Sequence, residues 1–132
     1  LSWVDKSTSY PNLNQERSTL EGLSKLYYFI ACDLNIFNKN EDALPFYEKS
    51  INTMEKCCAI NYSQLYTQEL ASSHYQYARQ LESLGQNEMA LIEAQKSLEL
   101  FHFLMEQSGS EMNNDLEENK NIVEELIDDL MC

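Results

Sequence analysis

The chain has 132 residues and a formal net charge of −13, which comes from 22 acidic and 9 basic side chains. A length of this order is typical of one domain with a modest core. The acidic balance argues against binding to nucleic-acid phosphates or to an anionic membrane surface, since both need a basic face, and it is compatible with a basic protein partner.

The composition favours an all-α fold. Only two prolines and three glycines are spread along the chain, and runs of β-branched residues are absent. No apolar stretch approaches the roughly 20 residues that a membrane-spanning helix needs. We therefore expect helices that pack on one another and no membrane partner.

The four cysteines of the chain match no zinc-site spacing. Cys57 and Cys58 are neighbours, so they cannot form an unstrained disulfide with each other. Free thiols in a reducing compartment are the simplest interpretation, and the sequence predicts a cytoplasmic or nuclear protein.

Residues 1–12 carry no helical period, and we expect an irregular lead-in there. From Leu13 to Phe37 apolar residues recur at a spacing of three and four, which predicts a helix. These residues are Leu20, Leu23, Tyr27, Ile30, Ala31 and Leu34. The polar stretch 38–40 breaks the pattern, and Glu41 begins a second helix that extends to about Ile60. Its apolar positions are Ala43, Leu44, Tyr47, Ile51 and Met54. Residues 13–62 are thus predicted to form an antiparallel helical hairpin.

Residues 63–108 repeat this arrangement. We expect a turn over residues 61–67, a helix from Gln68 to Leu84, a break at Gly85, and a helix from Asn87 to about Gln107. One face of the earlier helix carries Tyr77, Ala78, Leu81 and Leu84, and one face of the later helix carries Ala90, Leu91, Ala94, Ser97 and Leu98. Small residues on both faces predict a close approach of the two helices.

The two predicted hairpins match each other at an offset of 47 residues. The matching pairs are Ala31 and Ala78, Leu34 and Leu81, Ala43 and Ala90, Lys49 and Lys96, and Ser50 and Ser97. An internal repeat of this kind predicts helical units that stack into an array.

Each hairpin resembles a tetratricopeptide (TPR) repeat. That family places a small residue one turn into each helix, a large apolar residue beside it and a glycine at the turn. Here Ala78, Tyr77 and Gly85 occupy those positions, followed by Ala90 and Ala94. The resemblance implies a right-handed α-solenoid of two TPR-like hairpins with helices longer than usual. Such long repeats are similar to those of kinesin light chains and of the interrupted-repeat histone chaperones.

Residues 113–132 are predicted to form an acidic amphipathic helix that caps the last hairpin. Asn114 is a suitable N-cap residue, with Glu117 as its capping-box partner. The apolar stripe consists of Leu116, Val123, Leu126, Ile127 and Leu130, and the acidic face consists of Glu117, Glu118, Glu124, Glu125, Asp128 and Asp129. The acidic face either keeps the cap hydrated or forms a surface for a basic segment.

The resemblance implies a concave groove, lined by the first helix of each repeat, that binds a segment of a partner protein. The family's groove positions fall on Lys25, Tyr28, Phe29, Cys32, Asn35, Ile36, Ser72, Tyr75, Gln76, Arg79, Glu82 and Ser83. Tyr28 and Tyr75 are candidate anchors, although aromatic residues at helical spacing also form cores. One family subclass clamps acidic tails with Lys and Asn at fixed groove positions. Here those positions hold Tyr28, Phe29, Cys32, Tyr75, Gln76 and Arg79, so a carboxylate clamp is not expected.

We expect no catalytic site, cofactor or metal. His74 occupies a position where the family packs a large side chain, and His102 has no carboxylate or thiol at a ligand spacing. The sequence contains no phosphate-binding glycine loop and no nucleophile with a supporting local motif.

Three functions remain open. The first is a non-enzymatic adaptor or scaffold that binds a protein or peptide in its groove. The second is an acidic, histone-chaperone-like domain for a basic protein. The third is an assembly element, because two repeats and a cap are fewer than a typical array and the chain lacks an initiator methionine. Such an element would pack against further repeats of a longer parent chain or form a homodimer.

Overall fold

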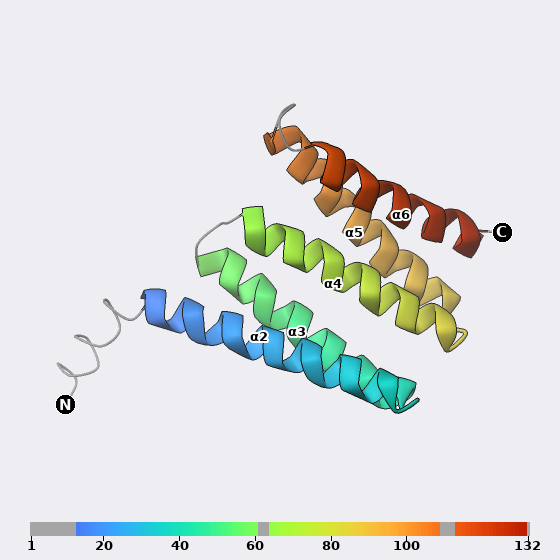
Figure 1. Ribbon diagram of the computed structural model, residues 1–132, viewed down its shortest axis with the longest axis horizontal. Coiled ribbons are helices and arrows are strands. Elements are labelled where there is room, and N and C mark those ends of the chain that lie inside the picture. The colour runs from blue at the N-terminus through green and yellow to red at the C-terminus, as the bar shows by residue number, and fades with distance from the viewer. Residues whose placement is uncertain (1–12, 61–63, 109–112, 132) are drawn as a thin grey trace.

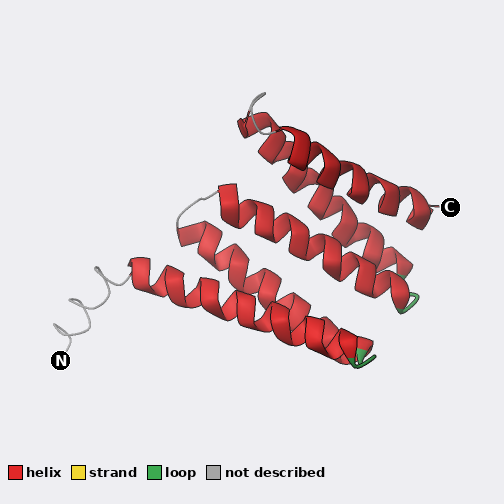
Figure 2. Ribbon diagram, viewed as in Figure 1, coloured by secondary structure: helices red, strands yellow, loops and turns green. Residues whose placement is uncertain are grey.

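The computed structural model describes residues 13–60, 64–108 and 113–131, and the expected lead-in over residues 1–12 lies outside this part of the chain. The described residues form helices joined by short turns, with no strand among them (Figure 2). The helices are α2 (Leu13–Ile36), α3 (Asn40–Ile60), α4 (Gln64–Ser83), α5 (Asn87–Ser108) and α6 (Asn113–Met131). The all-α prediction is confirmed.

Each helix packs mainly against its neighbours in sequence, so α2 pairs with α3, α3 with α4, α4 with α5, and α5 with α6. Figure 1 shows α2, α4 and α6 in the layer nearer the viewer and α3 and α5 behind them. The molecule is therefore an array of two helical hairpins that ends in one further helix, as the sequence predicts.

The two hairpins turn in the same way. Asn38 and Gly85, which are equivalent at the 47-residue offset, both have a left-handed backbone, with φ of 62° and 79°. After each of them a backbone N–H closes the helix end: Lys39 donates to the Leu34 carbonyl at 2.8 Å and Gln86 to the Leu81 carbonyl at 2.9 Å. Glycine adopts this conformation without steric cost, and asparagine tolerates it better than most residues.

Matching small residues are buried in the two hairpins. Ala31, Ala43, Ala78 and Ala90 are all fully buried. A serine hydroxyl bonds the facing helix in both hairpins: Ser50 Oγ donates to the Ser24 carbonyl at 2.8 Å, and Ser97 Oγ donates to the Ala71 carbonyl at 2.7 Å. The repeat thus extends from sequence to individual hydrogen bonds.

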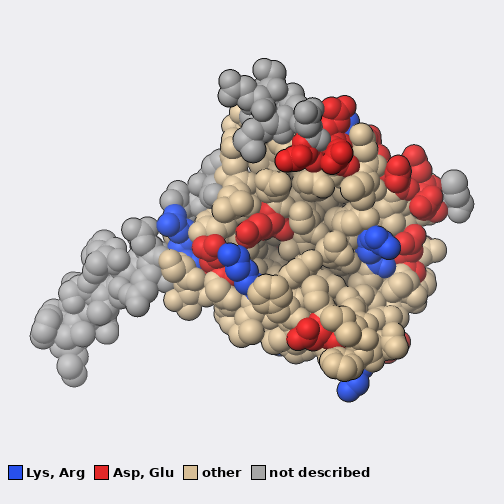
Figure 3. Space-filling model, viewed as in Figure 1, with Lys and Arg blue, Asp and Glu red and all other residues tan. Residues whose placement is uncertain are grey.

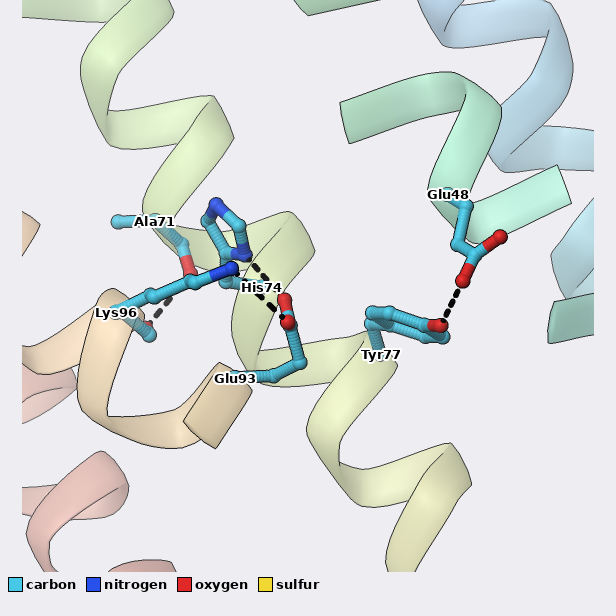
Figure 4. Close-up of polar contacts among 7 residues, drawn as sticks. Glu48, Ala71, His74, Tyr77, Glu93 and Lys96 are labelled. Carbon is cyan, nitrogen blue, oxygen red and sulfur yellow. Dashed lines mark hydrogen bonds and ion pairs between the residues drawn. The ribbon is translucent and has the colours of Figure 1, made fainter. Parts of the chain in front are cut away.

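The core consists of two connected clusters. The first takes its buried residues from α2, α3 and α4 and from Ala90 of α5, and the second takes its buried residues from α4, α5 and α6. Tyr77 of α4 joins the hairpins, because its ring lies 6.2 Å from that of Tyr47 and its hydroxyl donates to Glu48 Oε1 at 2.6 Å (Figure 4). Val123 and Leu126 of α6 are 1% and 6% exposed, so the predicted apolar stripe covers the second cluster.

The beginning of α4 differs from the sequence prediction. The helix starts at Gln64 rather than at Gln68, and residues predicted as turn belong to its first turn. Tyr66 and Thr67 are buried there, and the Tyr66 hydroxyl donates to Glu21 Oε2 of α2 at 2.6 Å. This contact across the array stabilises a helical turn whose own sequence is weakly patterned. At the other end of the chain, α6 begins at Asn113, one residue before the predicted N-cap.

Candidate functional site

A cavity of about 510 Å³ opens between α2 and α4, with α3 as its floor. Its lining residues are Ser24, Lys25, Tyr28 and Phe29 of α2, Ser50 and Met54 of α3, and Leu65, Gln68, Glu69, Ser72 and Ser73 of α4. We call this cavity the α2–α4 groove. Figure 3 shows this face of the molecule hollowed, with mostly uncharged surface and with basic and acidic atoms close together at the margin.

Part of the predicted groove lies here. Four of the residues assigned to the groove line the cavity: Lys25, Tyr28, Phe29 and Ser72. The other proposed groove residues do not line it. These are Cys32, Asn35, Ile36, Tyr75, Gln76, Arg79, Glu82 and Ser83.

The residues beyond the cavity have partners of their own. Asn35 donates its side-chain N–H to the Tyr47 hydroxyl at 2.7 Å, and Arg79 lies over the ring of Tyr75, 6.0 Å from its centroid. Tyr75 packs against the second core cluster. These contacts stabilise the helices that carry the groove.

Tyr28 belongs to both the core and the groove. Its ring packs against the first core cluster and meets the ring of Tyr47 edge to face, 6.0 Å between centroids. Burial raises the pKa of the Tyr28 hydroxyl to about 12, with a further contribution from Cys32. The groove wall therefore contains a neutral phenol held rigidly by packing, which is a suitable contact surface for a peptide.

Sequence reasoning missed the floor and the first two turns of α4. Ser50 and Met54 lie on the second helix of a hairpin, which the family resemblance does not place in the groove. Leu65, Gln68 and Glu69 precede Ser72 by one and two helical turns and so share its face. Extending that face backwards from Ser72 would have found them, had α4 been predicted to begin early enough.

Two acidic residues near the groove, Glu21 and Glu69, differ in their hydrogen-bond partners. Glu21 of α2 accepts a hydrogen bond from Tyr66 Oη at 2.6 Å and another from Lys25 Nζ at 3.2 Å. The Tyr66 bond, followed by Lys25, holds the pKa of the Glu21 carboxyl below its usual value despite partial burial. Glu69 of α4 has the opposite environment. Its Oε2 atom is buried without a hydrogen-bond partner among the described residues, and burial raises its pKa.

A second polar cluster lies inside the second hairpin (Figure 4). His74 Nδ1 lies 2.7 Å from Glu93 Oε1, and Lys96 Nζ lies 3.4 Å from Glu93 Oε2. Both His74 and Glu93 are buried, with 4% and 7% exposure. Burial disfavours the Glu93 carboxylate, but the His74 and Lys96 contacts outweigh it and lower the pKa of Glu93. The predicted packing position of His74 therefore contains a buried hydrogen bond between His74 and Glu93 that the sequence did not reveal.

The equivalent positions of the first hairpin are aromatic. Tyr27, Phe46 and Lys49 replace His74, Glu93 and Lys96 at the 47-residue offset. Lys49 Nζ lies 5.7 Å from the ring centroid of Tyr27 and 5.4 Å from that of Phe46. The same position of the repeat is thus filled by aromatic side chains in the first hairpin and by a histidine and a glutamate in the second. This equivalence indicates a structural role for His74 and Glu93.

The predicted acidic face lies on the outside of α6. Five of its six residues are exposed, and Glu124 is partly buried beside Lys120, whose Nζ lies 3.7 Å from Glu124 Oε1. The exposed residues are Glu117, Glu118, Glu125, Asp128 and Asp129. This face lies opposite the apolar stripe that covers the second core cluster.

The described ranges contain no group of three or more His, Cys, Asp or Glu residues placed to hold a metal ion. Within the same ranges, no helix is both long enough and apolar enough to cross a bilayer. Cys32, Cys57 and Cys58 are free thiols, and burial raises the pKa of Cys57 and of Cys58. Their thiolate forms are therefore disfavoured.

Comparison of the chain with protein-family models, with curated proteins and with solved structures found no match. Function must therefore be argued from the arrangement of the chain's own residues.

Proposed function

We propose that the chain is a non-enzymatic, TPR-type interaction module that holds a segment of a partner protein in the α2–α4 groove. The observation that carries the proposal is the pair of large apolar side chains at this groove. Phe29 of α2 is 62% exposed and Leu65 of α4 is 60% exposed, and both line the cavity. Exposed apolar side chains beside a cavity are typical of an interaction site.

The hairpin fold does not require these side chains. At the 47-residue offset Phe29 corresponds to Gln76 and Leu65 to Ser18, and both of those residues are polar. The buried small residues that hold the helices together are instead the same in both hairpins. The apolar groove residues are therefore specific to one place in the array, which supports a role in binding.

The TPR assignment is supported by the repeat and by the position of the cavity. Small residues are buried at equivalent positions, a left-handed residue closes each hairpin, and the cavity lies between the first helices of the two hairpins. A concave surface between first helices is where this family binds its partners. A segment of about one or two helical turns, or an extended peptide, would cover a cavity of this size.

The test uses a random library of displayed dodecapeptides, selected against the full 132-residue chain. Dissociation constants of the enriched peptides are then measured by fluorescence anisotropy. We expect the Phe29→Gln/Leu65→Ser variant to bind the peptides at least tenfold more weakly, because it removes apolar contact area.

The matched control is Ile92→Ser, which removes a comparably exposed apolar side chain, 46% exposed, from α5 and away from the cavity. It should bind as the parent chain does. Equal losses in both variants, or enriched peptides that ignore the groove substitutions, would refute the proposed site.

The acidic face of α6 favours a second candidate function, the binding of a basic protein in the manner of an acidic histone chaperone. Its five exposed carboxylates are part of the chain's net charge of −13. The two functions differ in their response to salt. Binding driven by many charges weakens steeply between low and physiological salt, and binding driven by groove contacts changes little.

A further inference from the structure

Glu69 is the feature of the α2–α4 groove that the fold does not explain. Its side chain lines the cavity, and its Oε2 atom has no hydrogen-bond partner among the described residues. A buried carboxylate oxygen without a donor destabilises the folded chain, because it has lost its water without replacement. A residue of this kind beside a cavity is expected to be satisfied by whatever fills the cavity.

The basic residue of the groove lining hydrogen-bonds Glu21, although its charge also acts to lower the pKa of Glu69. Lys25, the basic residue that lines the cavity, donates to Glu21 Oε1 at 3.2 Å, and its side chain remains half exposed. Glu21 also receives the Tyr66 hydroxyl, so this neighbouring carboxylate is well satisfied. Glu21, beside the groove, therefore has two donors, whereas Glu69 in the groove lining has an oxygen without one.

The groove offers an apolar contact close to this acid. Leu65 precedes Glu69 by one turn on α4, and Phe29 follows Lys25 by one turn on α2. All four residues line the same cavity. Long basic side chains suit such a place, since their methylene stems pack on apolar surface and their charged ends reach a carboxylate.

We infer that the α2–α4 groove selects a partner segment that places a Lys or Arg side chain against Glu69, next to a large apolar side chain in contact with Phe29 and Leu65. This inference rests on the proposed function, because it names the chemistry of the partner for the same groove. The acidic net charge of the chain assists the approach of such a segment.

The experiment extends the peptide selection. The enriched peptides from the full chain should contain Lys or Arg within a few positions of an aromatic or aliphatic residue. One such peptide is synthesised with its basic residue intact and with that residue replaced by Gln. Both are measured by fluorescence anisotropy against the parent chain, Glu69→Gln and the control Glu118→Gln, which removes the same charge from the exposed face of α6.

We expect Glu69→Gln to weaken binding of the basic peptide by about tenfold and to leave binding of its Gln version nearly unchanged, because the charge-assisted hydrogen bond is lost only in the first case. Glu118→Gln should leave both affinities close to those of the parent chain. The control for folding is the thermal unfolding of Glu69→Gln, monitored by circular dichroism.

The possible failures are distinct. If Glu69→Gln and Glu118→Gln weaken binding equally, or if the enriched peptides contain no excess of Lys and Arg, the inference about Glu69 is wrong while groove binding stands. If Phe29→Gln/Leu65→Ser binds every peptide as the parent chain does, both the proposed function and the inference are wrong.

Discussion

At the residue scale, the second hairpin shows how a buried histidine–glutamate hydrogen bond can replace an aromatic contact. His74 and Glu93 occupy the positions that Tyr27 and Phe46 occupy in the first hairpin, and a lysine borders both sites. A buried polar pair forms its hydrogen bond only after both groups have lost water. The pair therefore adds little to stability, although removal of either member leaves the other buried without its partner.

This dependence can be tested by replacing His74 and Glu93 with the aromatic residues found at the equivalent positions of the first hairpin. We expect His74→Leu and Glu93→Leu, made singly, to lower the free energy of unfolding by about 1 to 3 kcal/mol, because each leaves a buried polar partner without its hydrogen bond. The double variant His74→Tyr/Glu93→Phe should lie within about 2 kcal/mol of the parent chain. Urea unfolding followed by circular dichroism measures both quantities, and a double variant that shows the sum of the two single losses would contradict the argument.

The same pair predicts a response to acid. The pKa of Glu93 is lower in the folded chain than its usual value of 4.5. Its contribution to stability is therefore present above the unfolded pKa and is lost as the pH falls through the folded pKa. The double aromatic variant should lack this part of the acid sensitivity, which serves as an internal control in the urea measurements.

At the scale of the helices, the hairpin turns were the most predictable feature. Polar breaks at residues 38–40 and at Gly85 end sustained helical patterns, and the structure places a left-handed residue in each. A Cβ atom added at Gly85 would meet no other atom within 4 Å, so only the backbone conformation restricts this position.

We accordingly expect Gly85→Ala to lower the free energy of unfolding by about 1 to 2 kcal/mol, because alanine disfavours a positive φ. Gly85→Asn should cost less, since Asn38 already occupies the equivalent position. Thermal unfolding of the two variants compares these costs directly. A larger loss for Asn than for Ala would show that the two turns are not equivalent.

The start of α4 and the groove were less predictable, because both depend on contacts between residues that are distant in sequence. Gln64 to Thr67 are recruited into a helix by a contact with Glu21, which lies 45 residues before Tyr66. The spacing of apolar residues within a segment gives no information about a contact with a residue so distant in sequence. Four residues that the family resemblance assigned to a groove line the cavity, but the resemblance could not identify the floor residues of α3 or the unsatisfied carboxylate of Glu69. Glu93 was missed because a glutamate within a helical pattern is usually exposed.

At the scale of the whole molecule, α6 closes one end of the array. Its apolar stripe covers side chains of α4 and α5, including Phe101 and Leu104, which are 2% and 3% exposed. An array of stacked hairpins requires such a cover, because each unit buries its apolar face only against a neighbour.

Shortening the chain to end at Ser108 should therefore expose the second core cluster and lower the unfolding temperature substantially. A graded version is Leu126→Ala, which we expect to cost about 2 to 5 kcal/mol, as is usual for a buried leucine. Ile122→Ala on the same helix is the control, because Ile122 is 45% exposed and its loss should be small. Equal effects of the two substitutions, measured by urea unfolding, would argue against α6 as a cover.

The matched sites of Lys49 and Lys96 have a consequence for the array as a whole. The two hairpins use different contacts at the same position. In the first hairpin the contact is between aromatic rings, which do not titrate with acid, and in the second it involves a carboxylate, which does. At this position, acidification weakens the later unit and leaves the earlier one as it was. The two copies of the motif therefore differ in how this one position responds to acid.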